Sequence, residues 1–389
     1  MKELNDFPML KKDIIYFDNA ATSLKPKCVI DKMNEYYFEY SANSHRGDYD
    51  ISFRVDDEID NTRILIKDFI NARKKEEIIF TKNTTDSLNM VVFGYFEHYL
   101  NENDEVILST EEHASNILPW MILKAKKNIK IVFLETNDIS ELESTINNNT
   151  KVISLAHITN VKGIKRDIKK ICELAHKRNI LVVVDAAQSA PHIKTDVQDL
   201  DCDFLAFSAH KMLGPTGVGV LYGKYELLNN MIPTTYGGGM NNDYNEKELS
   251  LLSIPYRFES GTPNISGIIG FSEAIKYINN YGIDNIERHI RYLRRYLVKE
   301  LKNIPYIKIY NEKEEGSTVI INMDNVMSGD LGLYLNSKKI CTRSGKHCAK
   351  MLGEDTLRIS LYFYNTYEEI DCLINALKDK KSILEFINN

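Results

Sequence analysis

One cysteine near the end of the sequence has neighbours that suggest chemistry. In the segment RSGKHCAK, Cys348 follows Lys346 and His347 and stands five positions after Arg343. Positive charge near a thiol stabilises the thiolate, which is the nucleophilic form of cysteine. Structural cysteines instead occupy apolar surroundings as small hydrophobic side chains. The segment therefore predicts a nucleophilic cysteine, although it does not indicate what the thiol attacks.

The remaining cysteines favour no other chemistry. The six cysteines of the chain form no CxxC pair, so the sequence indicates neither a disulfide framework nor a zinc site, and we expect no metal. Cys172 and Cys372 lie in the helical patterns RDIKKICELAHKRN and EEIDCLINALK, where we expect them to pack as apolar residues. Cys341 shares a polar segment with Cys348, but its immediate neighbours are Ile340 and Thr342, whereas Cys348 directly follows His347.

A second group of candidate residues follows two apolar runs in the middle of the chain. The run ILVVVD ends at Asp185 and is followed by Gln188, while FLAFS ends at Ser208 and is followed by His210 and Lys211. Ligands of open α/β sheets bind at the carboxyl ends of the strands. An aspartate and a lysine in these places suit pyridoxal phosphate, whose aldehyde forms a Schiff base with lysine and whose ring nitrogen pairs with a carboxylate. Taken singly, the aspartate can also be a helix cap and the lysine a solvated side chain.

The phosphate of such a cofactor needs hydrogen-bond donors. The segment KNTTDSLNM places Thr84 and Thr85 at the start of a predicted helix, where free backbone N–H groups attract anions. Ser208 and His210 can add donors, and the alternative role of Thr84 is that of a simple N-cap. The glycines of GPTGVG fit neither the dinucleotide fingerprint nor the P-loop, which argues against a nucleotide-binding protein.

The elements that position these residues form two predicted domains. Between residues 77 and 222 the runs EIIFT, EVILS, KIVFLE, KVISLAH, ILVVVD, FLAFS and GVGVLY alternate with helical patterns, which indicates an α/β fold with a parallel sheet covered by helices. A long helix over 283–302, further strands and a last helix predict a smaller α+β domain. In TLRISLY, Leu357 and Ile359 lie on one face of a strand and Arg358 on the other. We assign residues 13–265 to the large domain, and residues 1–12 with 266–389 to the small one.

Composition narrows the class of protein. The 389 residues are 43% hydrophobic and 27% charged, as in a soluble globular protein, and the length suits roughly two domains. A net charge of −6 argues against a broad nucleic-acid surface. No apolar run approaches the ~18 residues of a membrane span, and MKELNDFPML lacks the apolar segment of a signal peptide. We therefore expect a cytoplasmic protein that binds neither a membrane nor, directly, nucleic acid.

Along almost its whole length the chain resembles a known family, the Suf-type (group II) cysteine desulfurases among the pyridoxal-phosphate-dependent class V aminotransferase-like enzymes. The resemblance begins at YFDNAATSLKP and ends at RISLYFYNTYEEID. Between them, in the family's order, are NSHRGDYDIS, FTKNTTDSLN, STEEHASNILPW, HITNVKG, VVVDAAQSAPH, DLDCDFLAFSAHKMLGPTGVGVLY, YGGGM, RFESGTPNISGIIG and RSGKHCA. The resemblance implies the fold type I architecture, with a mostly parallel seven-stranded sheet in the large domain.

The resemblance also implies roles for individual residues. Lys211 would form the Schiff base, His113 of EEHASN would stack on the ring and move protons, and Cys348 would accept sulfur. Asp185 would pair with the ring nitrogen and Gln188 would contact the phenolic oxygen. Thr85, Ser208 and His210 would bind the phosphate, with Thr84 nearby. Thr262 of ESGTPN would reach the phosphate of the partner subunit in a homodimer. The substrate carboxylate would be bound by Asn160, Arg358 and Arg343.

The implied reaction converts L-cysteine to L-alanine and leaves the sulfur on Cys348 as a persulfide. The sulfur would then pass to a SufE- or SufU-like acceptor protein or a scaffold, for iron–sulfur cluster or thio-cofactor biosynthesis. The alternatives are a selenocysteine lyase, another class V enzyme such as an aminotransferase, or a non-catalytic protein that keeps the fold.

Around the cysteine the sequence departs from the Suf-type pattern. Lys346 replaces a second histidine, Lys350 and Met351 replace an apolar–proline pair, and only ten positions separate Cys348 from Arg358. Lys346 either lowers the pKa of the thiol or is a solvated charge.

Other residues near these motifs have open roles. His347 is either catalytic or a loop residue. His45 and Arg46 match a family motif near the active site, and we expect Asn19 and Ala20 to pass close to the cofactor.

Overall fold

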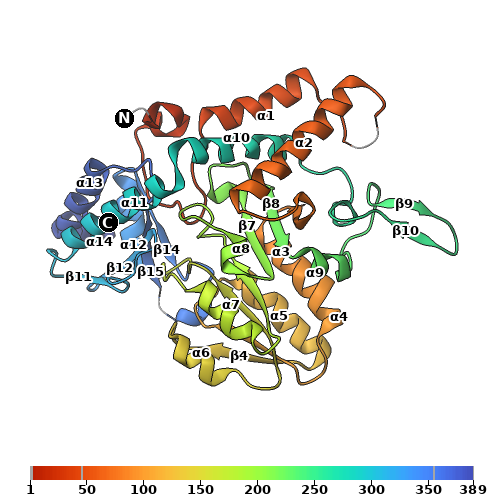
Figure 1. The fold of residues 1–389 in the computed structure, drawn as a ribbon. Coiled ribbons are helices and arrows are strands. Elements are labelled where there is room, and N and C mark those ends of the chain that lie inside the picture. The colour runs from red at the N-terminus through yellow and green to blue at the C-terminus, as the bar shows by residue number, and fades with distance from the viewer. Residues whose placement is uncertain (1–2, 45–46, 354, 389) are drawn as a thin grey trace.

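A seven-stranded sheet forms the centre of the larger part of the chain (Figure 1). The structure is a computed structural model and describes residues 3–44, 47–353 and 355–388. The strand order is β2-β8-β7-β6-β5-β3-β4, and every neighbouring pair is parallel except those made by β8. The prediction of a mostly parallel seven-stranded sheet is confirmed. The strands are β2 (Ile78–Thr81), β3 (Glu105–Ser109), β4 (Lys130–Leu134), β5 (Thr150–Ala156), β6 (Leu181–Asp185), β7 (Phe204–Ser208) and β8 (Gly219–Gly223).

Helices cover both faces of this sheet because successive side chains of a buried strand point to opposite faces. In β6, Val182 and Val184 belong to one buried cluster and Val183 to another. The first cluster packs against α1 (Lys27–Glu39), α2 (Asp50–Phe69), α7 (Ile168–His176), α8 (Val197–Leu200) and α10 (Ile265–Tyr281). The second packs against α3 (Thr84–Val91), α5 (Ala114–Lys127) and α9 (Tyr225–Asn230).

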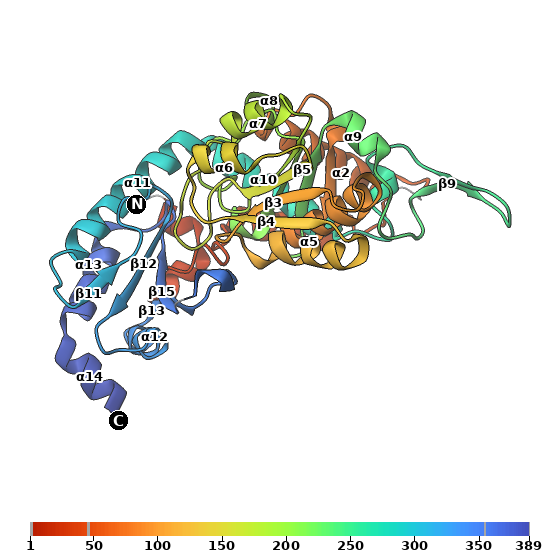
Figure 2. The ribbon, with the colours of Figure 1, turned by 90° about the horizontal axis from the view of Figure 1, so that it is seen from below.

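The small domain holds a four-stranded antiparallel sheet with the order β11-β12-β15-β14. Its strands are β11 (Ile307–Ile309), β12 (Thr318–Met323), β14 (Arg343–Gly345) and β15 (Thr356–Ser360). Its helices are α11 (Ile283–Leu301), α12 (Ser328–Ser337), α13 (Tyr367–Lys378) and α14 (Lys380–Asn388). Figure 2 shows this domain at one end of the molecule and the hairpin of β9 (Asn241–Tyr244) and β10 (Leu249–Leu251) at the other.

The N-terminal segment connects the two parts. Strand β1 (Ile15–Tyr16) pairs in parallel with β13 (Ile340–Cys341), and Asp18 makes a parallel bridge with Ser360. Residues 15–18 therefore join strands of the small domain, although the sequence-based boundary placed them in the large one. The domain boundaries themselves stay a prediction. The other α-helices of the described residues are α4 (Glu97–Tyr99) and α6 (Ile139–Thr145), and a π-helical segment covers Val92–Phe96.

The two cysteines that were expected to pack as apolar residues differ in burial. Cys172 is buried, as its helical pattern predicts, whereas Cys372 is exposed, so the expectation that Cys372 packs as an apolar residue is wrong. It stands next to Asp371 on α13, whose buried side is formed by Ile370, Leu373 and Ile374. Among the described residues, no helix combines the length and the apolar character needed to cross a bilayer.

Candidate active site

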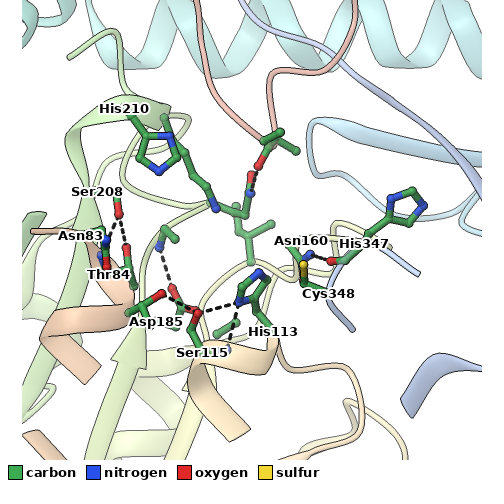
Figure 3. A pocket seen from close by; sticks show the side chains of 18 of the residues that line it. Asn83, Thr84, His113, Ser115, Asn160, Asp185, Ser208, His210, His347 and Cys348 are labelled. Carbon is green, nitrogen blue, oxygen red and sulfur yellow. Dashed lines mark hydrogen bonds between the residues drawn. The ribbon is translucent and has the colours of Figure 1, made fainter. Parts of the chain in front are cut away.

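A cavity of about 360 Å³ lies at the carboxyl ends of β5, β6 and β7. Its volume is in the range of small-molecule sites. It is lined by Ala20, Ala21, Asn83, Thr84, Thr85, His113, Ser115, Ala156, Ile158, Asn160, Asp185, Ala187, Gln188, Ser208, His210, Lys211, Arg343, His347, Cys348 and Arg358. Every residue to which the sequence assigned a catalytic or binding role is among them except Thr262. Of Asn19 and Ala20, which were expected close to the cofactor, Ala20 lines the cavity and Asn19 does not. Figure 3 shows how these side chains converge from both domains.

Asp185 and Lys211 lie at the carboxyl ends of two neighbouring strands and form the floor of the cavity, Asp185 within its strand and Lys211 just after its own. Asp185 is the last residue of β6, and Lys211 closes the short turn that follows β7. Asp185 is 5% exposed, and its carboxylate accepts the N–H of Ala187 at 2.9 Å. Burial raises the pKa of Asp185 and lowers the pKa of Lys211 to about 8, while each charge favours the ionised form of the other.

His113 is the N-cap of α5 and lies beside these two residues. Its Nδ1 accepts the backbone N–H of Ser115 at 3.1 Å, so the neutral ring carries its proton on Nε2. Burial, together with the charges of Lys211 and Arg358, lowers the pKa of His113 to about 4. The imidazole is therefore neutral at pH 7 and has a defined tautomer.

Hydroxyl groups and a helix start form one end of the cavity. The N–H of Thr84, the first residue of α3, donates to Oγ of Ser208 at 2.7 Å, and the hydroxyl oxygens of the two residues lie 2.6 Å apart. The hydroxyl of Thr85 lies 2.7 Å from that of Ser115. The helix itself is capped by Asn83, which accepts the N–H of Asp86, so the N-cap role considered for Thr84 belongs to Asn83.

Two arginines form the wall that belongs to the small domain. Arg358 is 3% exposed and donates from Nη1 to the backbone oxygen of Asn160 at 2.9 Å. Its Nε is buried and has no partner among the described residues. Arg343 is about half exposed and makes a two-pronged ion pair with Asp18, with Nε 3.0 Å from Oδ1 and Nη2 2.9 Å from Oδ2. Burial lowers the pKa of Arg358 to about 10, which leaves it charged.

The loop that carries Cys348 is held at three points. Nδ2 of Asn160 donates to the carbonyl oxygen of His347 at 2.7 Å, and the N–H of Ala114 donates to the carbonyl oxygen of Cys348 at 2.8 Å. The ring of His347 is buried and its Nε2 lies 3.1 Å from the carbonyl oxygen of Thr356. The side chain of Cys348 is exposed, and so is that of Lys346. These contacts favour the loop role that was left open for His347.

The structure places Thr262 apart from this cavity. It lines a second cavity, of about 100 Å³, together with Ser44, Gly238 and Glu259. The role predicted for Thr262 at the partner's phosphate stays a prediction. His45 and Arg46, whose roles were left open, lie outside the described residues.

Several residues at the site were missed from the sequence. Asn83, Ser115 and Ala21 line the cavity, and Asp18 pairs with both arginines. Asn83 stands directly before the two predicted threonines, so the helix-start argument had the information to include it. Asp18 lies in the motif YFDNAATSLKP, but nothing local predicts its ion pairs, because its partners are more than 300 positions away along the chain.

The donors and acceptors of the cavity fit pyridoxal phosphate. Threonine and serine hydroxyls at the start of α3 suit a phosphate. A buried carboxylate whose pKa is raised suits a protonated ring nitrogen, because the positive charge compensates the cost of burying a negative one. Lys211, with its lowered pKa, suits an aldehyde. Together with the sheet topology, this set defines a pyridoxal-phosphate-dependent enzyme of fold type I, with pyridoxal phosphate as its cofactor.

The comparisons with known proteins give the family. The profile described as "Aminotransferase class-V" matches residues 15–373, and the chain belongs to this family. It is 43% identical to a probable cysteine desulfurase of Borreliella burgdorferi, over 96% of this chain and 94% of that protein.

Solved structures agree with this assignment. The fold superposes with a TM-score of 0.93 on the apo structure of a cysteine desulfurase from Thermococcus onnurineus, at 37% identity over 97% of this chain and 96% of that one. The TM-score is 0.92 for the cysteine desulfurase CsdA of Escherichia coli, at 34% identity over 99% and 98% of the two chains.

Proposed function

We propose that this protein is a cysteine desulfurase that converts L-cysteine to L-alanine and stores the sulfur as a persulfide on Cys348. The observation that carries the proposal is that Cys348, Lys211 and Arg358 line one cavity although they come from three separate segments. The names of the relatives point to the same activity.

Binding of the substrate is assigned to Arg358. Its guanidinium is buried and charged, and its Nε has no partner among the described residues, so it can receive a carboxylate without losing a hydrogen bond already made. A planar guanidinium suits a planar carboxylate. The buried position also limits competition from water for that contact.

Proton transfer is assigned to Lys211 and His113. When bound, pyridoxal phosphate withdraws electrons from the Cα atom of the amino acid and so acidifies its proton. The pKa of about 8 leaves a useful fraction of Lys211 neutral at pH 7, and its amine accepts the Cα proton. His113 lies beside Lys211, is neutral and carries its proton on Nε2, so its imidazole can accept a proton or give one back during the reaction.

Sulfur transfer is assigned to Cys348. Its thiolate attacks Sγ of the substrate, so that an S–S bond forms on the protein while the Cβ–Sγ bond of the substrate breaks. The bonding electrons of the broken bond stay with the three-carbon fragment, which takes up protons and leaves as alanine. No external oxidant is needed, because Cys348 sulfur and substrate sulfur each give up one electron and the substrate carbon takes up both.

The exposed position of Cys348 supports the next step. A persulfide on this side chain is accessible to a second protein. We therefore propose a SufE- or SufU-like acceptor or a scaffold protein as partner, supplying iron–sulfur cluster or thio-cofactor biosynthesis.

We also propose a homodimer in which Thr262 contributes to the partner's phosphate site. Thr262 follows Gly261, whose φ of +80° gives the chain a turn there. A Thr262→Ala variant should stay dimeric in sedimentation and lose cofactor affinity at least about tenfold, the loss of one hydrogen bond to a charged group. Unchanged affinity in a proven dimer would contradict this assignment.

The decisive experiment measures alanine, sulfide and protein persulfide from the purified enzyme supplied with L-cysteine. Cys348→Ala should retain the absorbance of bound cofactor but form no persulfide, whereas Cys372→Ala, also an exposed cysteine, should behave as wild type. Full desulfuration by the Cys348 variant refutes the assignment. Turnover on selenocysteine in the same assay tests the alternative substrate.

A further inference from the structure

The two cavity arginines stand directly opposite each other on neighbouring strands. Arg343 of β14 and Arg358 of β15 are paired across the antiparallel ladder, so their side chains leave the sheet on the same face. Like charges in this position repel each other. An arrangement of this kind requires a compensating negative charge close by.

Asp18 supplies that charge. Its side chain is 15% exposed, and its carboxylate accepts from both Nε and Nη2 of Arg343 and lies 3.4 Å from Nη2 of Arg358. The ion pair with Asp18 is the main cause of the raised pKa of Arg343. Asp18 itself does not line the cavity, whereas both arginines do. It therefore contacts the arginines without lying among the groups that can touch a substrate.

The position of Asp18 is fixed by the backbone. Asp18 forms a parallel β-bridge with Ser360. Nδ2 of the neighbouring Asn19 donates to the carbonyl oxygen of Ser360 at 2.7 Å, and the N–H of Ala20 donates to the hydroxyl of Ser360 at 2.9 Å. Ser360 is two positions beyond Arg358 on β15. The carboxylate is thus attached to the strand that carries one of its partners.

We infer that Asp18 is the counter-ion that leaves the arginine pair with one net positive charge, and that Arg343 serves to neutralise Asp18 rather than to bind the substrate. Arg343 already uses Nε and Nη2 of its guanidinium to bind Asp18, whereas Nε of Arg358 has no hydrogen-bond partner among the residues that the structure describes. Two arginines and one aspartate make a site matched to a ligand with a single carboxylate. This deepens the proposed function, since it takes the carboxylate of an amino acid as the ligand.

Variants that change the net charge of the site distinguish two roles of Arg343, neutralising Asp18 or binding the substrate carboxylate directly. Arg343→Gln leaves Asp18 opposite Arg358 with no net charge, so the KM for L-cysteine and the dissociation constant of L-alanine should both rise at least about tenfold. The double variant Asp18→Asn/Arg343→Gln returns the site to one positive charge and should bring both constants back to within about threefold of wild type. If Arg343 contacts the substrate itself, the double variant binds as weakly as Arg343→Gln, which would overturn the inference.

Asp18→Asn alone provides a second test that does not depend on the folding of the Arg343 variant. Asparagine keeps the shape and one acceptor oxygen, while the net charge of the site rises from +1 to +2. L-Alanine should bind about threefold more tightly at low salt, and the gain should shrink as ionic strength rises. Weaker binding, or a change that salt does not affect, indicates a structural role and overturns the inference.

Binding is followed through the absorbance of the bound cofactor and does not require turnover. A wild-type enzyme that binds L-alanine but releases no sulfide from cysteine would contradict the proposed function while leaving the role of Asp18 testable. Thermal unfolding of each variant accompanies the titrations, and variants are compared at equal cofactor occupancy.

Discussion

Asn160 and His347 are joined by a hydrogen bond of 2.7 Å, from Nδ2 of the amide to the backbone carbonyl oxygen. His347 and the following Cys348 have φ values of +50° and +60°. The left-handed region costs a non-glycine residue roughly 1–2 kcal/mol, so two in succession need support from their surroundings. The hydrogen bond from Asn160 is part of that support, and its amide nitrogen is thereby engaged with the loop.

Asn160→Ala should therefore loosen the loop that carries Cys348 while leaving the floor of the cavity intact. We expect hydrogen exchange of the backbone amides of residues 346–350 to become about tenfold faster, the equivalent of one lost hydrogen bond of about 1.4 kcal/mol. Persulfide formation should slow while bound cofactor keeps its absorbance. Unchanged exchange in this segment would contradict the role of Asn160 as a support of the loop.

A buried ion pair lies directly beside His113. Arg166 donates from Nη1 to Glu112 at 2.6 Å, and both side chains are almost fully buried. Removing one member of a buried pair leaves an uncompensated charge, at a cost of about 3–5 kcal/mol. Arg166→Met should therefore strongly lower the urea midpoint of unfolding.

The controls for this prediction come from the same chain. The double variant Glu112→Gln/Arg166→Met removes the stranded charge and should recover more than half of the loss. Lys27→Met, which breaks the exposed pair with Asp31, should change stability by less than about 1 kcal/mol. Equal losses of stability in Arg166→Met and Lys27→Met would contradict the prediction that the buried pair of Glu112 and Arg166 contributes more to stability than an exposed pair.

The amine of Lys211 should react as a neutral base at lower pH than ordinary lysines. Burial lowers its pKa to about 8, against roughly 10.4 for an unperturbed lysine. In the apoenzyme, acetylation of Lys211 by a small reagent should rise with pH through a midpoint near 8, followed by mass spectrometry of the digested protein.

Asp185 provides the internal check on that midpoint. Its negative charge favours the ammonium form of Lys211, so Asp185→Asn should move the midpoint below 8. A midpoint near 10 in the wild type, or an upward shift in the variant, would show that the environment of Lys211 is not the one described.

Much of the fold follows from local patterns. The seven apolar runs coincide with β2 to β8 within one or two residues, because strands buried on both faces are continuous apolar segments bounded by polar ones. The reversal of β8 and the pairing of β1 with β13 were not predicted, since strand partners are set by contacts distant in sequence.

The residues of the site likewise fall into those that local sequence patterns predict and those that depend on contacts distant in sequence. Lys211 and Asp185 were predictable because strand ends meet at one edge of a parallel sheet. The contacts of Asp18 and Asn160 were not, because they depend on how the small domain lies against the large one. Alternation in β15 predicted that Arg358 faces away from Leu357, but its near-complete burial comes from the cavity wall.

The last prediction concerns stability far from the cavity. His176 of α7 lies between two carboxylates, with Nε2 2.9 Å from Asp203 and Nδ1 3.0 Å from Asp201. The hydrogen bond to Asp203 raises the pKa of His176, although burial and the charge of Lys224 oppose the shift. Because the pKa is raised on folding, the stabilisation is fully present below the unfolded value of about 6.5. It is lost as pH rises through the folded pKa.

His176→Gln should therefore lower the free energy of unfolding by about 1 kcal/mol at pH 5.5, a value typical of partly exposed ion pairs. The difference from wild type should shrink towards pH 9, as the imidazole of the wild type loses its proton. His98→Gln, at an exposed position of α4, is the matched control for replacing a histidine with glutamine and should change the free energy of unfolding by less than about 0.5 kcal/mol. A loss that is larger at pH 9 than at pH 5.5 would mean that the interaction does not depend on the charged imidazole, because only a protonated ring gains from the two neighbouring aspartates.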